Sequence, residues 1–204
     1  MTEKIKEYLN NTLWYHATLL EHFINIHNNG IKVDINKDTS NNTDFGYGFY
    51  LTNDHKRAEW FISNLLKYEV VEGVPVVLEF NFSPLQWFTL EEYSTKIFPK
   101  HNEEFGKFVF ENRLNNIDGA FQHRYDLIFG VMSDGYPTGL MIDYELGLIT
   151  KEAAVKALTK PYSMKQLSLH NQELCDIVKI SRAYSFDISN TENRKELNLN
   201  DYKI

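Results

Sequence analysis

Cysteine is nearly absent from this chain, because Cys175 is the only one among its 204 residues. A lone cysteine excludes an internal disulfide, and its apolar neighbours indicate inert packing rather than a nucleophile. The chain also lacks any apolar run near the roughly 20 residues that a membrane-spanning helix needs. Its first residues are polar where a signal peptide would have an apolar stretch. We therefore expect a soluble, cytoplasmic protein with no membrane partner.

Positive charge is also scarce. The chain has 21 Lys and Arg against 28 Asp and Glu, a net charge of −7. Proteins that hold nucleic acid without sequence preference present basic surface to the phosphates. Stable general binding to DNA or RNA is therefore not expected, although a nucleic-acid substrate could meet a local patch. The candidate patch consists of Lys96, Lys100, Lys107 and Arg113.

Two kinds of active site lack their usual pattern. A serine hydrolase of the α/β type would need a Gly-x-Ser-x-Gly turn, and the chain has none. A zinc site would need paired Cys or His at ligand spacing. No metal site is therefore expected. The histidines that have no Cys or His partner at ligand spacing are His22, His27, His55 and His101.

Apolar residues are plentiful and indicate a folded chain. Hydrophobic residues make up 43%, with 12 Tyr and 14 Phe, a composition that disordered proteins do not have. The length fits one compact domain. We expect a single domain over residues 1–204, with a polar C-terminal tail that begins near residue 189 and frays.

Hydrophobic periodicity predicts helices and strands in alternation. Apolar spacing predicts helices over residues 19–28, 54–68 and 150–158, and a helix over 90–114 that is broken near Pro99. Alternating and β-branched segments predict strands around His16 and over residues 31–35, 49–52, 75–82 and 125–132, with one or two more in 167–180. Because these strands are half polar, a mixed or antiparallel sheet is expected, and the class is α+β.

The most distinctive stretch, residues 44–52, reads Asp-Phe-Gly-Tyr-Gly-Phe-Tyr-Leu-Thr. Glycine allows positive φ and lets a backbone approach a ligand closely. The aromatic and β-branched residues that follow are typical of a strand, which carries Tyr50. Upstream, the short strand around His16 has Thr18 two residues later. Two strand ends therefore offer a histidine and a tyrosine.

This pairing resembles the nicotinamide-ribose pocket of the ADP-ribosyltransferase superfamily. There, a His-x-Thr or His-Gly-Ser strand and a Gly-x-Gly-x-Tyr strand together clamp NAD. The string over residues 44–52 is similar to that of an uncharacterised bacterial family within the superfamily, and the resemblance spans roughly residues 13–186. Its further matches are Ala58, Trp60, the strand over residues 125–130 with Asp134, and Gln172 at the head of a late strand.

The resemblance implies a split β-sandwich with peripheral helices, and an activity. The expected reaction is NAD-dependent mono-ADP-ribosylation of an unidentified protein or nucleic acid, with nicotinamide released and no metal. The resemblance also implies a bacterial toxin or defence effector, for which a cognate antitoxin is an expected partner. The resemblance assigns catalytic roles to His16, Tyr50 and Gln172. The rest of the NAD pocket is assigned to Ala17, Thr18, Gly46, Gly48 and Thr52.

Gln172 leaves alternatives open. Many superfamily members carry Glu here, where a carboxylate holds the ribose and favours its developing positive charge. A neutral amide cannot offset that charge, which favours a catalytically inactive NAD- or ADP-ribose-binding module. If the expected strand slips by one residue, Glu173 takes the position instead, because side chains alternate. An NAD glycohydrolase, with water as acceptor, is the third alternative.

The segment over residues 36–48 is rich in Asn, Asp, Ser and Thr and ends in two glycines. Such residues bury little apolar surface, so we expect the segment to be poorly held when the site is empty. Closure over NAD would exclude water from the reacting ribose.

Overall fold

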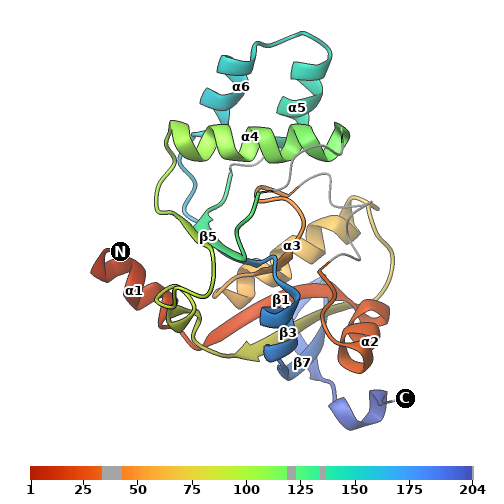
Figure 1. The fold of residues 1–204 in the computed structure, drawn as a ribbon. Coiled ribbons are helices and arrows are strands. Elements are labelled where there is room, and N and C mark those ends of the chain that lie inside the picture. The colour runs from red at the N-terminus through yellow and green to blue at the C-terminus, as the bar shows by residue number, and fades with distance from the viewer. Residues whose placement is uncertain (34–42, 119–122, 134–136, 204) are drawn as a thin grey trace. The chain divides into compact units, whose positions relative to one another are not determined.

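Two β-sheets, each with its own helices, make up the fold (Figure 1). The computed structural model describes residues 1–33, 43–118, 123–133 and 137–203. The chain divides into two compact units. Unit 1 comprises Met1–Lys32, Tyr50–Leu90 and Gln172–Ile204, and unit 2 comprises Val33–Phe49 and Glu91–Asn171. Sheets and helices together confirm the α+β class.

The helices of the described residues are α1 (Glu3–Leu9), α2 (Leu20–Asn29), α3 (His55–Lys67), α4 (Glu103–Asp118), α5 (Pro137–Glu145), α6 (Lys151–Leu158) and α7 (Gln172–Ile177). The strands are β1 (Leu13–Leu19), β2 (Phe49–Leu51), β3 (Pro75–Asn81), β4 (Thr95–Phe98), β5 (Leu127–Val131), β6 (Lys165–Leu169), β7 (Ile180–Asp187) and β8 (Asn190–Glu196). Short 3₁₀ helices are η2 (Pro84–Gln86) and η3 (Leu199–Tyr202).

The sheet of unit 1 is antiparallel, with strand order β1-β3-β7-β8. Helix α3 lies along it in Figure 1. The helix begins at its cap Asp54, whose carboxylate accepts the backbone N–H of Lys56 at 3.0 Å. Its apolar side packs Ala58 and Ile62 into a buried cluster with Leu19, Val77 and Phe186. Burial of this stripe fixes α3 against the sheet.

In unit 2, β5 is an interior strand of its sheet, since it pairs in parallel with β4 and antiparallel with β6. All five residues of β5 are buried, as its continuous apolar sequence requires. Helices α5 and α6 stand side by side against α4 (Figure 1). Gly130 allows close packing, because a Cβ there would lie 2.9 Å from the Cβ of Phe98.

Several elements confirm the prediction from periodicity and capping. Helices α2, α3 and α6 lie where the apolar spacing placed them. Gly30, with a φ of 76°, is the C-terminal cap of α2, and Thr150 caps α6 by accepting the N–H of Ala153 at 3.2 Å. The strands predicted over residues 49–52, 75–82 and 125–132 correspond to β2, β3 and β5.

The helix predicted over residues 90–114 is wrong in its first half. Residues 95–98 form β4, and α4 begins only at Glu103. The ladder with β5 supplies hydrogen bonds and buries Phe98, which local spacing could not reveal. The strand predicted over residues 31–35 is absent from residues 31–33, and the rest lies outside the described residues. Helices α1 and α5 were not predicted.

The C-terminal predictions need two further corrections. Residues 167–180 hold the end of β6 and then α7, so Gln172 begins a helix instead of a strand. The tail from residue 189 does not fray, because residues 190–196 pair with β7 as β8. An ion pair between Arg182 and Glu196 at 3.2 Å joins the same two strands. The polar side chains of β8 are mostly exposed to solvent, while its backbone is hydrogen bonded to β7.

Candidate functional site

The two motif strands meet within unit 1. Tyr15 and Thr52 form an antiparallel bridge, in which the N–H of Tyr15 donates to Thr52 O at 2.7 Å and the N–H of Thr52 donates to Tyr15 O at 3.0 Å. This bridge sets β1 beside the strand end that carries Tyr50. Residues that are far apart in the sequence are thereby neighbours in the fold.

His16 is oriented by a hydrogen bond from its ring. Its Nδ1 lies 2.8 Å from the backbone oxygen of Tyr50. A carbonyl oxygen only accepts, so Nδ1 carries the proton and Nε2 is the acceptor nitrogen of a neutral ring. Burial lowers the pKa of His16 to about 4, against the hydrogen bond to Tyr50, which raises it. The ring is therefore neutral at physiological pH.

The other predicted pocket residues of unit 1 have roles in the fold. Thr18 is buried within β1, and Ala17 packs against the apolar cluster under α3. The hydroxyl of Thr52 accepts the N–H of Asp54 at 3.2 Å, just before α3 begins. Tyr50 is partly buried. These contacts fix the strand ends around His16.

Gln172 is held elsewhere in unit 1. Its Nε2 donates to Ile31 O at 2.8 Å and to Asp176 Oδ1 at 2.7 Å. Because Gln172 begins α7, strand alternation does not decide between it and Glu173. Successive helical side chains instead diverge by about 100°. The two hydrogen bonds of its amide therefore hold Gln172 to Ile31 and Asp176.

The two glycines lie in unit 2, in a segment that we call the glycine loop, residues 43–48. Gly46 has a φ of 76°, and its carbonyl accepts the hydroxyl of Thr43 at 2.7 Å. The expectation that this segment is poorly held is wrong for residues 43–48, because Asp44 and Phe45 are buried. Residues 36–42 lie outside the described residues.

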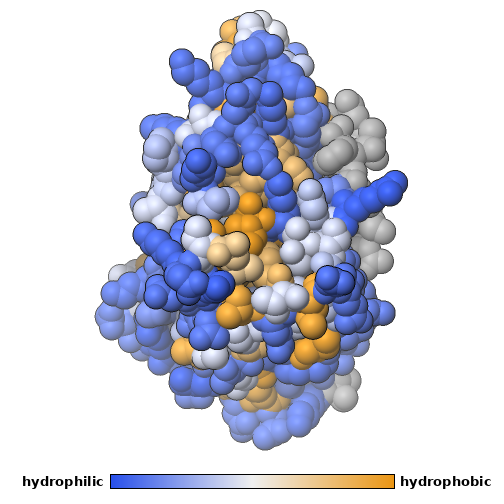
Figure 2. Space-filling view, turned by 60° about the vertical axis from the view of Figure 1, so that its left-hand side comes forward, coloured by the Kyte–Doolittle hydropathy of each residue, from blue (hydrophilic) through white to orange (hydrophobic). Residues whose placement is uncertain are grey.

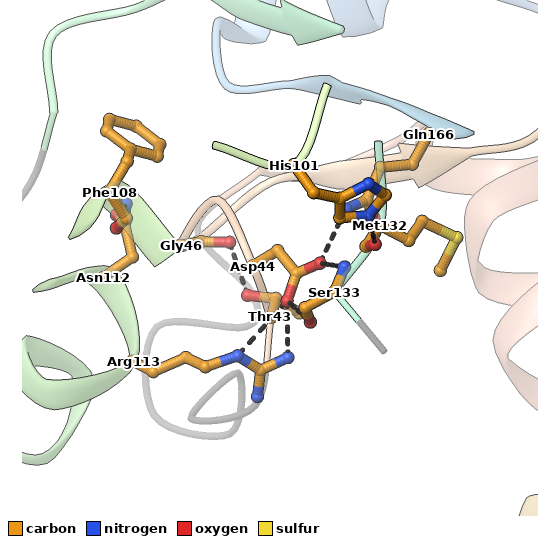
Figure 3. Close-up of polar contacts among 10 residues, drawn as sticks. All are labelled: Thr43, Asp44, Gly46, His101, Phe108, Asn112, Arg113, Met132, Ser133 and Gln166. Carbon is orange, nitrogen blue, oxygen red and sulfur yellow. Dashed lines mark hydrogen bonds and ion pairs between the residues drawn. The ribbon is translucent and has the colours of Figure 1, made fainter. Parts of the chain in front are cut away.

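A buried ion pair anchors the glycine loop (Figure 3). The side chains of Asp44 and Arg113 are 6% and 5% exposed, and Arg113 Nη2 donates to Asp44 Oδ1 at 2.7 Å. Asp44 Oδ2 accepts the N–H of Ser133 at 2.8 Å and Nε2 of Gln166 at 3.0 Å. Burial alone raises the pKa of Asp44, but Arg113 and Ser133 outweigh it and hold the pKa below its ordinary value.

Sequence reasoning missed this network. The sequence assigned no buried partner to Asp44, and it placed Arg113 in a candidate basic patch. Arg113 is instead buried, so that patch is not formed as predicted. The available signal was position, since Arg113 lies three and four residues after the apolar Phe110 and Val109 on one side of α4.

Two histidines face the backbone of the glycine loop. Nε2 of His123 lies 2.6 Å from Phe45 O, and Nδ1 of His170 is hydrogen bonded to Tyr47 O. The imidazole rings meet edge to face, with centroids 4.4 Å apart. Burial lowers the pKa of His123, and it lowers that of His170 to about 3. Both rings are therefore neutral at physiological pH.

Ser168 and His170 do not form a catalytic pair, although their Oγ and Nε2 are 2.8 Å apart. Ser168 has no exposed surface and cannot reach a substrate. Cys175 is buried as well, and burial raises the pKa of its thiol to about 12, which agrees with inert packing.

Metal-binding clusters and membrane-spanning helices are absent from the described residues. Residues 1–33, 43–118, 123–133 and 137–203 hold no group of three or more His, Cys, Asp or Glu placed to bind a metal ion. Among the helices that the structure describes, none has the length and apolar character to cross a membrane. The face drawn in Figure 2 is largely hydrophilic, with smaller hydrophobic areas between.

Gly48→Ala should destabilise unit 2. A Cβ at position 48 would lie 2.7 Å from the His170 ring and 2.9 Å from Leu169 O, closer than packing allows. Overpacking of this kind costs about 1 to 3 kcal/mol. Urea unfolding measures it, with Gly147→Ala as the control, because an added Cβ there meets no atom within 4 Å. Since Gly147 has a φ of 70°, the control carries backbone strain without the clash, and equal losses in both variants would contradict the packing argument.

Comparison with known proteins places the chain in a family. A family model described as "Protein of unknown function (DUF3990)" matches residues 27–180. That range contains the glycine loop, the Asp44 ion pair and both loop histidines, and it begins after His16. No curated protein and no solved structure gives a match.

Proposed function

Since the chain belongs to the DUF3990 family, described only as proteins of unknown function, its activity must be inferred from its own residues. We propose that it is an NAD-dependent mono-ADP-ribosyltransferase that modifies a macromolecule and releases nicotinamide. We further infer an ADP-ribosyltransferase-like split β-sandwich, and a bacterial toxin or defence effector that acts in the cytoplasm and has a cognate antitoxin.

One observation carries the proposal. The His-x-Thr strand and the Tyr50 strand are joined by the Tyr15–Thr52 bridge and by the bond from His16 to Tyr50 O at 2.8 Å. The motif resemblance requires these two strands to lie together, yet nothing in their sequence separation demands it. Their pairing supports a nicotinamide-ribose clamp at this end of β1.

The chemistry assigns each group a task. The bond between ribose C1′ and nicotinamide breaks, and its electron pair leaves with nicotinamide. The acceptor then bonds to C1′ and loses a proton. Nε2 of His16 accepts a hydrogen bond from a ribose hydroxyl group, and the Tyr50 ring stacks on nicotinamide. Groups that bind the oxocarbenium-like ribose more tightly than the ground state accelerate the reaction.

The rival proposal is an NAD- or ADP-ribose-binding module without activity. It is favoured by Gln172, a neutral side chain whose amide already donates to Ile31 O and Asp176. An amide held in this way gives no charge to stabilise a ribose cation. The glycohydrolase alternative differs only in its acceptor, which would be water.

Labelled NAD separates these functions. The purified protein is incubated with NAD labelled in adenosine, together with separate pools of protein, RNA and DNA, and free nicotinamide is measured. Label in one pool together with nicotinamide release supports the transferase. Release without label indicates the glycohydrolase, binding without release indicates the inactive module, and no binding contradicts the proposed site.

Tyr50→Ala should weaken NAD binding by about tenfold to a hundredfold, because it removes a stacking face and the packing around it. Isothermal titration with NAD measures the effect. Tyr68→Ala is the matched control, since Tyr68 lies in the same unit and is 71% exposed. Unchanged affinity in a folded Tyr50→Ala protein would remove Tyr50 from the site.

A further inference from the structure

The backbone of the glycine loop is held at two carbonyl groups by imidazole rings. His123 reaches Phe45 O through Nε2 at 2.6 Å, and His170 reaches Tyr47 O through Nδ1. These carbonyls flank Gly46 on either side, so the two bonds fix the turn between them. All of these residues belong to unit 2.

The partners of each ring require opposite tautomers. Nδ1 of His123 accepts the N–H of Tyr125 at 3.2 Å, so its proton is on Nε2. For His170 the proton is on Nδ1, and Nε2 accepts the hydroxyl of Ser168 at 2.8 Å. That hydroxyl has a single hydrogen, and its other acceptor, Ile128 O, is farther away at 3.4 Å.

Each ring is also fixed by packing. Phe108 and Tyr125 lie against His123, with ring centroids at 5.5 and 5.6 Å. His170 packs against His123 and leaves no room for a side chain at Gly48. Neither imidazole can turn away without disturbing these neighbours, so the carbonyls of the loop have donors of fixed direction.

We propose that His123 and His170 are positioning residues, which hold the glycine loop in one conformation, so that backbone groups of this loop of unit 2 can bind NAD. The inference rests on the proposed function for its ligand. The claim that the two histidines hold the loop concerns only unit 2 and can be tested without NAD. Neither histidine contacts the ligand, and both act through the backbone of residues 45–47.

Conservative variants separate donation from ring packing. In His170→Asn, Nδ2 can replace the Nδ1 donor, and in His123→Gln, Nε2 can replace the Nε2 donor. The corresponding variants to Ala remove the donors. Amide hydrogen exchange over residues 43–48 should rise about tenfold in either Ala variant, the effect of one lost hydrogen bond, and return to within about threefold of the original in Asn and Gln. His27→Ala, whose ring stacks on Phe23 in unit 1, is the control.

Two further readouts complete the experiment. Long-range ¹H–¹⁵N spectra should show the Nε2–H tautomer for His123 and the Nδ1–H tautomer for His170. NAD affinity should fall in the Ala variants and recover with the donors. Wrong tautomers, or exchange unchanged by either Ala variant, would overturn the positioning role.

The two proposals fail in different ways. If the unmodified protein binds no NAD while exchange and tautomers behave as expected, the proposed function fails and the two histidines still position the loop. If NAD binds equally well to all variants while exchange changes, the loop is not part of the binding site and the positioning inference is overturned.

Discussion

Asp44→Asn should lower the free energy of unfolding by about 3 to 5 kcal/mol, the usual cost of breaking a buried ion pair on one side. The guanidinium of Arg113 would keep its charge with no counter-ion at 2.7 Å. The amide would also oppose one of the donors that now point at Asp44, namely Ser133 or Gln166. Urea unfolding followed by circular dichroism measures the loss.

Asp187→Asn is the matched control for this substitution. Asp187 also accepts the N–H and hydroxyl of a serine, Ser189, at 2.8 and 2.7 Å, but it is exposed at the surface. Little change is expected there. The double substitution Asp44→Leu and Arg113→Met should recover part of the loss, because it removes both charges together. A single variant as stable as the control would contradict a structural role for the pair.

Lowering the pH from 7 to 5 should destabilise the protein. At pH 5, each of two buried histidines should lower the free energy of unfolding by about 2 kcal/mol. The pKa values of His16 and His170 are lowered by burial to about 4 and about 3. The unfolded chain, with its ordinary histidine pKa near 6.5, therefore binds protons that the folded chain does not. Stability is fully present above pH 6.5 and is lost as the pH falls toward the folded pKa.

Neighbouring titratable groups do not reverse this loss of stability at low pH. His22 acts on His16 and His123 acts on His170, and each lowers the pKa of its neighbour further. The pKa of Asp44 lies below its ordinary 3.8, so its own contribution is lost only at lower pH. His170→Asn should reduce the slope of unfolding free energy against pH between 7 and 5. A flat profile in the unmodified protein would contradict neutral buried histidines.

The sequence by itself determined the locally encoded elements. Helix α3 has its own cap in Asp54 and an apolar stripe, and α6 has Thr150. The sequence also predicted the α+β class and the placement of His16 and Tyr50 on strands. Each of these predictions depends on residues that are close together in the sequence. Over such short distances, the spacing of apolar residues along the chain predicts which side chains share one face of a helix or strand.

Only the tertiary structure decided the rest. Residues 95–98 became β4 because β5 lies beside them, and residues 190–196 became β8 because β7 offers its backbone. Asp44 and Arg113 are 69 positions apart, yet they share one buried hydrogen-bond network with Ser133 and Gln166. The spacing from Val109 and Phe110 places Arg113 on one side of α4, but it does not reveal the carboxylate that makes burial of the charge possible. Whether a charged residue stays in water or finds a partner inside is decided by the free energy of desolvation against that of long-range contacts, and those contacts exist only once the chain has folded.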